Sequence, residues 1–138
     1  MMGDMTSPAA ARRLISSGSE FETTYSYSRA VVVGPHVMLS GTTGYDYATS
    51  TLAAGAEEQT KQLFRNAAAA FAKAGADLAD VVRVRMYIAK TGDYEAVMGV
   101  FAATFRGIDP ACTTVQAGLF DPDILVEMDM DAILDARA

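Results

Sequence analysis

One strictly alternating segment between two helical patterns does most to limit how this chain can fold. Residues 81–89 place valine, methionine and isoleucine at every second position, with arginine and tyrosine in between. Side chains of a strand point to opposite faces with a period of two, so this strand has one apolar and one polar face. A strand of this kind belongs to a sheet that helices cover on one side only.

Helical patterns stand on both sides of this strand. Between about residues 54 and 74, Leu63, Ala67 and Phe71 fall on one apolar stripe. Gly75 follows, and glycine commonly ends a helix. The second helix is expected over about residues 93–105. Each helix falls between two strands, as a crossover connection does.

Runs rich in β-branched and aromatic residues predict the other strands. These are residues 12–16, 25–33, 36–40, 112–117 and 124–134. Gly34-Pro35 reads as a hairpin turn between the second and third of them, and the last two read as strands joined by a turn. The order β-β-β-α-β-α-β-β predicts an α+β fold, a mixed β-sheet with two helices on one face. Residues 1–10 read as a flexible N-terminal tail and 11–138 as a single domain.

Composition excludes several kinds of partner. The net charge of -6 and the absence of a basic cluster argue against nucleic acid. One cysteine and one histidine cannot form a disulfide or a His/Cys metal cluster within one chain. No apolar run approaches the roughly 20 residues that span a bilayer, and the N-terminus has no apolar signal-peptide core. We therefore expect a cytoplasmic protein with no metal, nucleic-acid or membrane partner.

The polar face of the predicted sheet carries two charged stripes. Glu127, Asp129 and Asp131 alternate along the last strand, and Arg83 and Arg85 alternate along the strand at 81–89. If these strands are neighbours, cross-strand ion pairs follow. The face is then either a solvated charged surface or a polar subunit interface. Alternate residues lie about 6.6 Å apart, so three carboxylates in a row are too spread to share one metal.

Short motifs from about residue 13 onward share their order and spacing with a known family. They are Val37-Met38-Leu39-Ser40-Gly41, Glu58-Gln59-Thr60, Asn66, Ala74-Gly75-Ala76, Asp80-Val81-Val82, Phe105, Pro110-Ala111, Thr113-Thr114-Val115 and Leu125-Val126-Glu127. Together they resemble the RidA/YjgF family. The resemblance implies a chorismate-mutase-like fold, a homotrimer and ligand clefts between subunits. It also implies hydrolysis of reactive enamines and imines to 2-keto acids and ammonia, without a cofactor.

The resemblance also suggests roles for particular residues. Glu127 corresponds to the acid that handles water, Tyr27 to a pocket tyrosine and Gly41 to a backbone contact with the ligand, and Thr114 joins the ligand-binding positions. Cys112 stands where active members have an arginine that clamps the substrate carboxylate. A thiol cannot make that two-point charged contact, so the chain departs from the family's deaminases at the clamp.

Each of these residues also has a plainer interpretation. Glu127 can simply belong to the charged stripe, Tyr27 can be strand packing, and Cys112 can be inert packing or a reactive thiol. Arg29 shares a face with Tyr27 on an extended strand, so it is either a substitute cation for the clamp or a surface arginine. The sequence supports three functions, which we rank from the best to the least supported: a divergent imine or enamine hydrolase, a non-catalytic metabolite-binding trimer, and an endoribonuclease or translation inhibitor.

Overall fold

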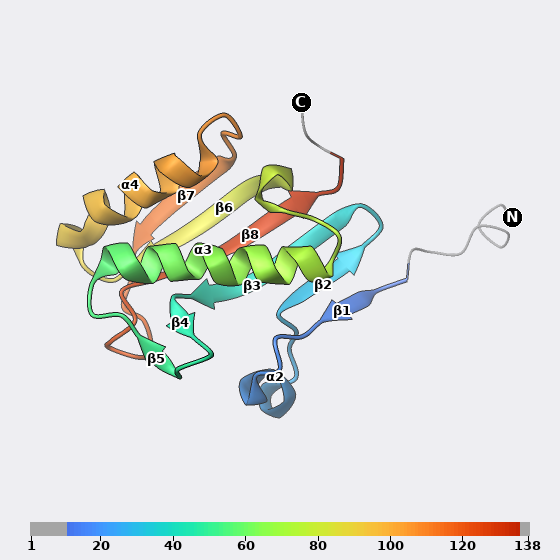
Figure 1. Cartoon of the computed structure of the whole chain (residues 1–138), viewed down its shortest axis with the longest axis horizontal. Helices are drawn as coiled ribbons and strands as arrows, with labels where there is room; N and C mark the ends of the chain where they lie inside the picture. The colour runs from blue at the N-terminus through green and yellow to red at the C-terminus, as the bar shows by residue number, and fades with distance from the viewer. Residues whose placement is uncertain (1–10, 136–138) are drawn as a thin grey trace, which may run out of the picture.

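The computed structural model describes residues 11–135, which form one mixed sheet backed by helices (Figure 1). The six-stranded sheet has the order β1-β2-β3-β8-β6-β7, and a separate two-stranded ribbon pairs β4 with β5. The strands are β1 (Arg13–Ile15), β2 (Ala30–Val33), β3 (His36–Thr43), β4 (Tyr45–Asp46), β5 (Thr51–Leu52), β6 (Val81–Ile88), β7 (Ala111–Gln116) and β8 (Val126–Ile133). The helices are α2 (Glu20–Tyr25), α3 (Ala56–Lys73) and α4 (Tyr94–Phe105), with 3-10 turns at Leu78–Asp80 and Thr91–Asp93.

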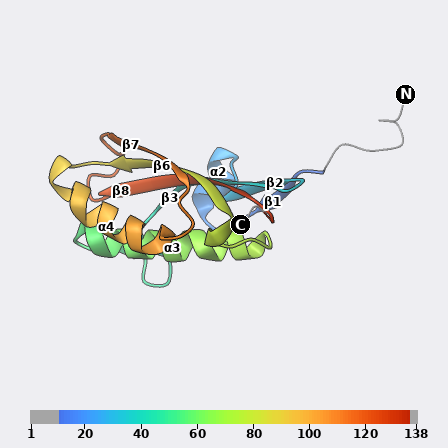
Figure 2. The same cartoon turned by 90° about the horizontal axis from the view of Figure 1, so that it is seen from above.

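Helices α3 and α4 lie together on one face of the sheet (Figure 2). The stripe Leu63, Ala67 and Phe71 predicted for α3 is fully buried. Phe105 of α4 packs edge-on against Phe64 of α3, with ring centroids 5.4 Å apart. Burying an aromatic or large aliphatic side chain stabilises the fold by about 1.5–3 kcal/mol. The helix periodicity therefore identified the core correctly, and the α+β fold with two helices on one face is confirmed.

The alternation in β6 and β8 also holds in the structure. Val84 and Met86 face the helices and are fully buried, whereas Arg83 and Arg85 face away from them and are exposed. β6 pairs directly with β8, and Nη1 of Arg85 lies 2.8 Å from Oδ1 of Asp129. The predicted cross-strand ion pair is confirmed. Exposed pairs of this kind contribute only about 0–1 kcal/mol, so the charged face does little to hold the sheet together.

The sequence predicts that the last two strands form a hairpin, and this prediction is wrong. β6 lies between them and pairs in parallel with β7 and antiparallel with β8. A parallel pair needs a long crossover, and α4 supplies it between β6 and β7. The chain then crosses β6 before β8 begins, which carries residues 112 and 127 to different strands on opposite sides of β6.

The strand predicted over residues 25–33 is wrong in its first half. Residues 20–25 form α2, Ser26 adopts a left-handed conformation at φ 62°, and β2 begins only at Ala30. The side chain of Ser19 accepts a hydrogen bond from the backbone N–H of Phe21, and Glu20 and Glu22 stand in the first turn. Capping and the helix dipole thus outweigh the β-propensity of Tyr25. Residues 45–52, where the sequence predicted no strand, contain the β4–β5 ribbon.

The second face of the sheet is left open by this arrangement. Its exposed apolar side chains include Leu14 on β1, Met38 on β3 and Val115 on β7. A shallow groove of about 630 Å³ crosses the same face near the β2–β3 turn, between Met38, Arg83 and Asp131. Scattered exposed apolar residues are normal, but a face with a groove and several of them suits a partner surface. No helix within residues 11–135 is long and apolar enough to cross a membrane.

Candidate functional site

The carboxyl group of Glu127 lies against the backbone of Gly41. β3 and β8 pair antiparallel, and their register shifts between Leu39 and Thr42, so Gly41 falls in an irregular stretch of β3. A Cβ atom at Gly41 would overlap Oε2 of Glu127. Irregular pairing of this kind re-aims side chains and often accompanies functional sites. The absence of a side chain at position 41 thus makes the space that the carboxyl group occupies.

Glu127 is a partly buried acid without a partner. Its carboxylate takes part in no hydrogen bond or ion pair with any residue from 11 to 135. Burial raises the pKa of Glu127 above its usual 4.5; the attraction of Arg29 lowers it in part, and repulsion from Asp129 raises it further. A carboxyl group with a raised pKa can exchange protons closer to neutral pH. This combination favours acid–base chemistry over a purely structural role.

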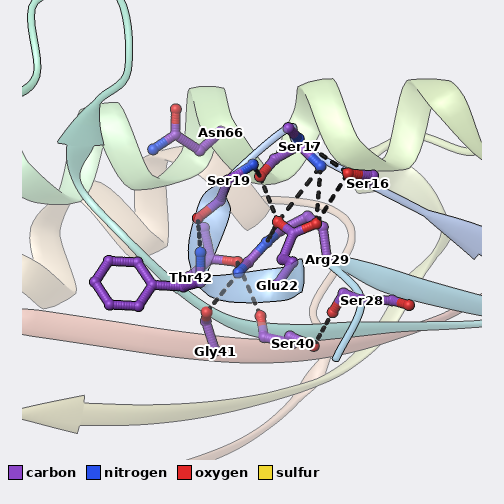
Figure 3. A network of polar contacts seen from close by, with 12 residues as sticks. Ser16, Ser17, Ser19, Glu22, Ser28, Arg29, Ser40, Gly41, Thr42 and Asn66 are labelled. Carbon is purple, nitrogen blue, oxygen red and sulfur yellow. Dashed lines mark hydrogen bonds and ion pairs between the residues drawn. The ribbon is translucent and has the colours of Figure 1, made fainter. Parts of the chain in front are cut away.

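Arg29 lies behind Gly41 and is buried, not a surface arginine. Its Nη1 donates to the carbonyl oxygen of Gly41 at 2.6 Å and to Oγ1 of Thr42 at 3.1 Å. Its Nε lies 3.5 Å from Oε2 of Glu22. Figure 3 shows the guanidinium group surrounded by Glu22, Gly41 and Thr42. The expected extended strand from Tyr27 to Arg29 is wrong, and the surface interpretation of Arg29 fails with it.

Glu22 anchors the other side of Arg29. The side-chain hydroxyls of Ser16 and Ser17 and the backbone N–H of Ser17 donate to the Glu22 carboxylate. Burial raises the pKa of Glu22, but these hydrogen bonds, with the charge of Arg29, outweigh it and leave the pKa below 4.5. Glu22 is therefore ionised at neutral pH, and the buried pair is a charged one. No pattern in the sequence pointed to Glu22, because its burial depends on α2, and residues 17–24 were predicted to form neither a helix nor a strand.

Tyr27 completes a chain of contacts that ends at Glu127. Its ring centroid lies 5.8 Å from Cζ of Arg29, within the range of a cation–π contact. The side chain itself is 43% exposed. Tyr27 contacts Arg29, Arg29 contacts Gly41, and Gly41 contacts Glu127. Four of the six predicted site residues are thus brought together in one chain.

Cys112 and Thr114 lie elsewhere. Cys112 is opposite Val84 on the helix-covered face, whereas Glu127 is opposite Tyr87 on the open face. Two strand spacings and three residues of offset separate their Cα atoms by about 14 Å. The exposed thiol of Cys112 has one hydrogen-bonding contact in residues 11–135, Oγ1 of Thr114 at 3.6 Å. One copy of the chain therefore does not unite Cys112 with Glu127, and nothing described around the thiol activates it.

No group of three or more histidine, cysteine, aspartate or glutamate side chains in residues 11–135 could hold a metal ion. The Arg85, Tyr87 and Asp129 cluster is internally paired: the Tyr87 hydroxyl donates to Oδ2 of Asp129 at 2.9 Å, beside the ion pair with Arg85. Repeated carboxylates on β8 therefore differ in kind. Asp129 is neutralised by its neighbours, and Glu127 is not.

Replacing Gly41 by alanine is expected to displace the Glu127 carboxyl group. The added methyl group overlaps Oε2, so either β3 shifts or the Glu127 side chain rotates away. The atom in the way is the end of a flexible side chain, so the rotation costs little unfolding free energy, but it removes part of the burial that raises the pKa of Glu127. Gly99→Ala is the matched control, because open space surrounds Gly99 on α4. Titration of the Glu127 carboxyl carbon by NMR should show a lower pKa in Gly41→Ala than in Gly99→Ala, and equal values would contradict the prediction.

Comparisons with known proteins identify the family of the chain. The family profile described as endoribonuclease L-PSP matches residues 17–134. The uncharacterized protein SCO2049 of Streptomyces coelicolor is 33% identical over 129 residues, 93% of this chain and 95% of that protein. The 2-iminobutanoate/2-iminopropanoate deaminase of Dermatophagoides farinae is 30% identical over 90% of this chain and 98% of its own length.

Solved structures with a similar fold belong to the same family. The crystal structure of Rv2704 from Mycobacterium tuberculosis, a member of the YjgF/YER057c/UK114 family, is 39% identical and superposes with a TM-score of 0.82. The match covers 90% of this chain and all of that one. The sequence profile, the relatives and the fold converge, and this chain belongs to the RidA/YjgF family.

Proposed function

We propose that this protein hydrolyses a small reactive imine or enamine in the cytoplasm, with Glu127 as the catalytic residue. One observation carries the proposal: Glu127 is a partly buried carboxyl group with a raised pKa and no partner in residues 11–135, set against the bare backbone of Gly41. A structural carboxylate would be paired, as Asp129 is. The 30% identity to a 2-iminobutanoate/2-iminopropanoate deaminase supports the same class of substrate.

Hydrolysis of an imine needs one group that acts first as a base and then as an acid, and we assign both roles to Glu127. An enamine first tautomerises to the imine. In the protonated imine, the Glu127 carboxylate takes a proton from water as the oxygen bonds to the imine carbon, giving a carbinolamine with a neutral amino group. The protonated carboxyl group then gives that proton to the nitrogen, the carbon–nitrogen bond breaks to release ammonia, and the carboxylate accepts the hydroxyl proton as the carbonyl forms, before passing it to solvent. A carboxyl group with a pKa raised towards neutrality suits both half-reactions.

The substrate should differ from that of the family's deaminases at one point. Cys112 offers no charged two-point contact for a carboxylate, and Arg29 is committed to protein atoms. We therefore propose an imine whose recognition does not depend on a carboxylate clamp. Tyr27 and the Gly41 backbone would shape the cleft beside Glu127.

We further propose a homotrimer whose clefts lie between subunits. Two observations support it: the sheet has an open face with exposed apolar side chains, and Cys112 with Thr114 lies far from Glu127 within one copy. A neighbouring copy could bring its Cys112 edge to the Glu127 side of the first. Sedimentation equilibrium should give three times the chain mass of 14.6 kDa. A monomer at micromolar concentration would contradict this assembly.

Turnover is tested with imines made in situ. An amino-acid oxidase supplies 2-imino acids, and an amine oxidase supplies imines that lack a carboxylate. Semicarbazide competes for each imine, so added protein should lower the yield of semicarbazone and speed ammonia release. We expect the carboxylate-free imines to be hydrolysed at least as well as the 2-imino acids. Absence of acceleration over the whole panel would overturn the catalytic proposal.

The second candidate is a trimer that binds a metabolite without turning it over. The exchange of a charged clamp for Cys112 favours it, because binding can survive a loss that abolishes rate. A metabolite that raises the melting temperature, with no turnover in the imine panel, would identify this function. Ribonuclease activity, suggested by the name of the family profile, fits less well with a net charge of -6. RNA binding at physiological salt would reverse that order.

A further inference from the structure

We infer that Arg29 is a positioning residue: it ties the Gly41 carbonyl and the Thr42 hydroxyl to Glu22, and so fixes the backbone against which Glu127 lies. This inference rests on the proposed function. It assigns Arg29 a role different from substrate binding, because its guanidinium group contacts protein atoms and only 8% of its side chain is exposed.

The contacts of Arg29 span three segments of the chain. Nη1 holds two consecutive residues of β3, at 2.6 Å from the Gly41 carbonyl and 3.1 Å from the Thr42 hydroxyl. Nε faces Glu22 of α2 at 3.5 Å. The backbone of Arg29 also accepts from the N–H of Ser40 at 2.9 Å and donates to the carbonyl of Ile15 at 2.9 Å. Arg29 therefore braces the irregular part of β3 through both its backbone and its side chain (Figure 3).

The position of this brace matters because β3 is not held there by regular pairing. The register of β3 against β8 is interrupted between Leu39 and Thr42. A bulged segment lacks some ladder hydrogen bonds and depends on other contacts for its conformation. Arg29 supplies two of them, one to Gly41 inside the interrupted stretch and one to Thr42, where the pairing resumes. Gly41 is the residue whose backbone faces Oε2 of Glu127, so its position sets the space beside that carboxyl group.

Glu22 explains why Arg29 is not free for a substrate. A substrate carboxylate at the guanidinium group would have to stand beside the ionised Glu22 carboxylate, which would repel it. Ser16 and Ser17 hold that carboxylate in place from the other side. The only Arg29 nitrogen that is buried without a hydrogen bond in the described residues is Nε, which faces Glu22 at ion-pair distance. The arginine is thus locked between an acid and a backbone carbonyl.

Arg29 also acts on Glu127 through its charge. The groups that affect or face Glu127 are Arg29, Asp129 on the same strand and Tyr87 on β6. Of these, Arg29 alone lowers the pKa of Glu127, against the raising effect of burial. Losing Arg29 should therefore raise the pKa of Glu127 further. Loss of the charge alone gives this rise, so Arg29→Lys, which keeps the charge, separates the two effects: a shift of the Glu127 pKa in that variant reports a change in how the carboxyl group is placed.

The test uses a variant that removes both charges, Glu22→Gln with Arg29→Met, so that no lone buried charge is left. Arg29→Lys retains the charge without the planar fork. Arg13→Met is the matched control: Arg13 also donates to two backbone carbonyls, those of Lys73 and Ala74, but at the far end of α3. The expected result is a fall in kcat of about 10- to 100-fold for the double variant, with little change in KM. The control should keep wild-type kinetics.

Titration of the Glu127 carboxyl carbon by NMR provides a readout that needs no turnover. The pKa of Glu127 should rise in the double variant, change less in Arg29→Lys and stay constant in Arg13→Met. In active protein, the acid limb of the pH–rate profile should move to higher pH as the pKa of Glu127 rises. An unchanged Glu127 pKa, or a loss expressed only in KM, would overturn the positioning role. If the wild-type protein shows no turnover, the catalytic proposal fails while the titration still decides the role of Arg29.

Discussion

Glu127→Gln is expected to lower kcat for imine hydrolysis by about 10²- to 10⁴-fold, the usual contribution of a positioned acid–base group. Glutamine has nearly the same shape, so it fills the space beside Gly41 but cannot accept or return a proton. The measurement is ammonia release under saturating imine, with KM determined in parallel. Activity within a factor of two of wild type would mean that another group handles the water.

The same substitution should leave the protein as stable as before, or more so. Burial raises the pKa of Glu127 in the folded state. A group whose pKa is higher in the folded than in the unfolded protein stabilises the fold fully at pH values below its unfolded-state pKa. This stabilisation is lost as the pH rises through its folded-state pKa. At neutral pH the buried carboxylate is therefore a stability cost that glutamine removes. Asp131→Asn is the matched control on the same strand face, since Asp131 lies 3.5 Å from Arg85 and away from Gly41. It should keep wild-type kcat.

Arg29→Met is expected to destabilise the fold by about 3–5 kcal/mol, the cost of breaking a buried pair. It leaves Glu22 ionised, 5% exposed and without its countercharge, and it releases the Gly41 carbonyl and the Thr42 hydroxyl. The double variant with Glu22→Gln should recover most of this loss, because no lone charge remains. Urea unfolding of the two single variants and the double variant gives the coupling energy. Additive effects would show that the two side chains do not interact.

The acid dependence of this pair has a definite sign. The pKa of Glu22 is lower in the folded state than 4.5. A lowered pKa contributes stability above the unfolded pKa, and this stability is lost as pH falls through the folded value. The difference in stability between wild type and Glu22→Gln should therefore be constant near neutral pH and shrink below about pH 4.5. A difference that instead grows under acid conditions would contradict the assignment of Glu22 as the ionised partner.

Local patterns predicted most of the helices and strands because they report on single elements. The stripe of Leu63, Ala67 and Phe71 placed α3 and its buried face, and the alternation around Val84 placed β6. Both depend on side-chain spacing along one element, which the chain alone specifies. The prediction failed where two local signals competed. The strand predicted from residue 25 failed at its start, because Tyr25 belongs to α2, where capping by Ser19 and first-turn acids prevailed over the β-propensity of the tyrosine.

The site divides in the same way. The amino-acid order placed Glu127 and Asp129 on the polar face of one strand, and the family motif distinguished Glu127. Only the tertiary structure decided that Asp129 is neutralised by Arg85 and that Glu127 is not. The reason is physical: a carboxyl group's pKa depends on burial and on charges within several ångströms, and strands distant in sequence supply both.

Arg29 and Cys112 show the limit most clearly. The sequence has an arginine near a tyrosine, and it has a cysteine where the family has its carboxylate-binding arginine. This suggested that Arg29 could supply the cation that Cys112 cannot. The fold buries Arg29 against Glu22 and Gly41 and carries Cys112 to the far side of β6. Whether a segment is a helix or a strand, and which of its side chains are buried, follows from the spacing of apolar residues within that segment. Which charges meet follows from how the strands order themselves across the sheet, and that order is decided by crossovers and packing over the whole domain.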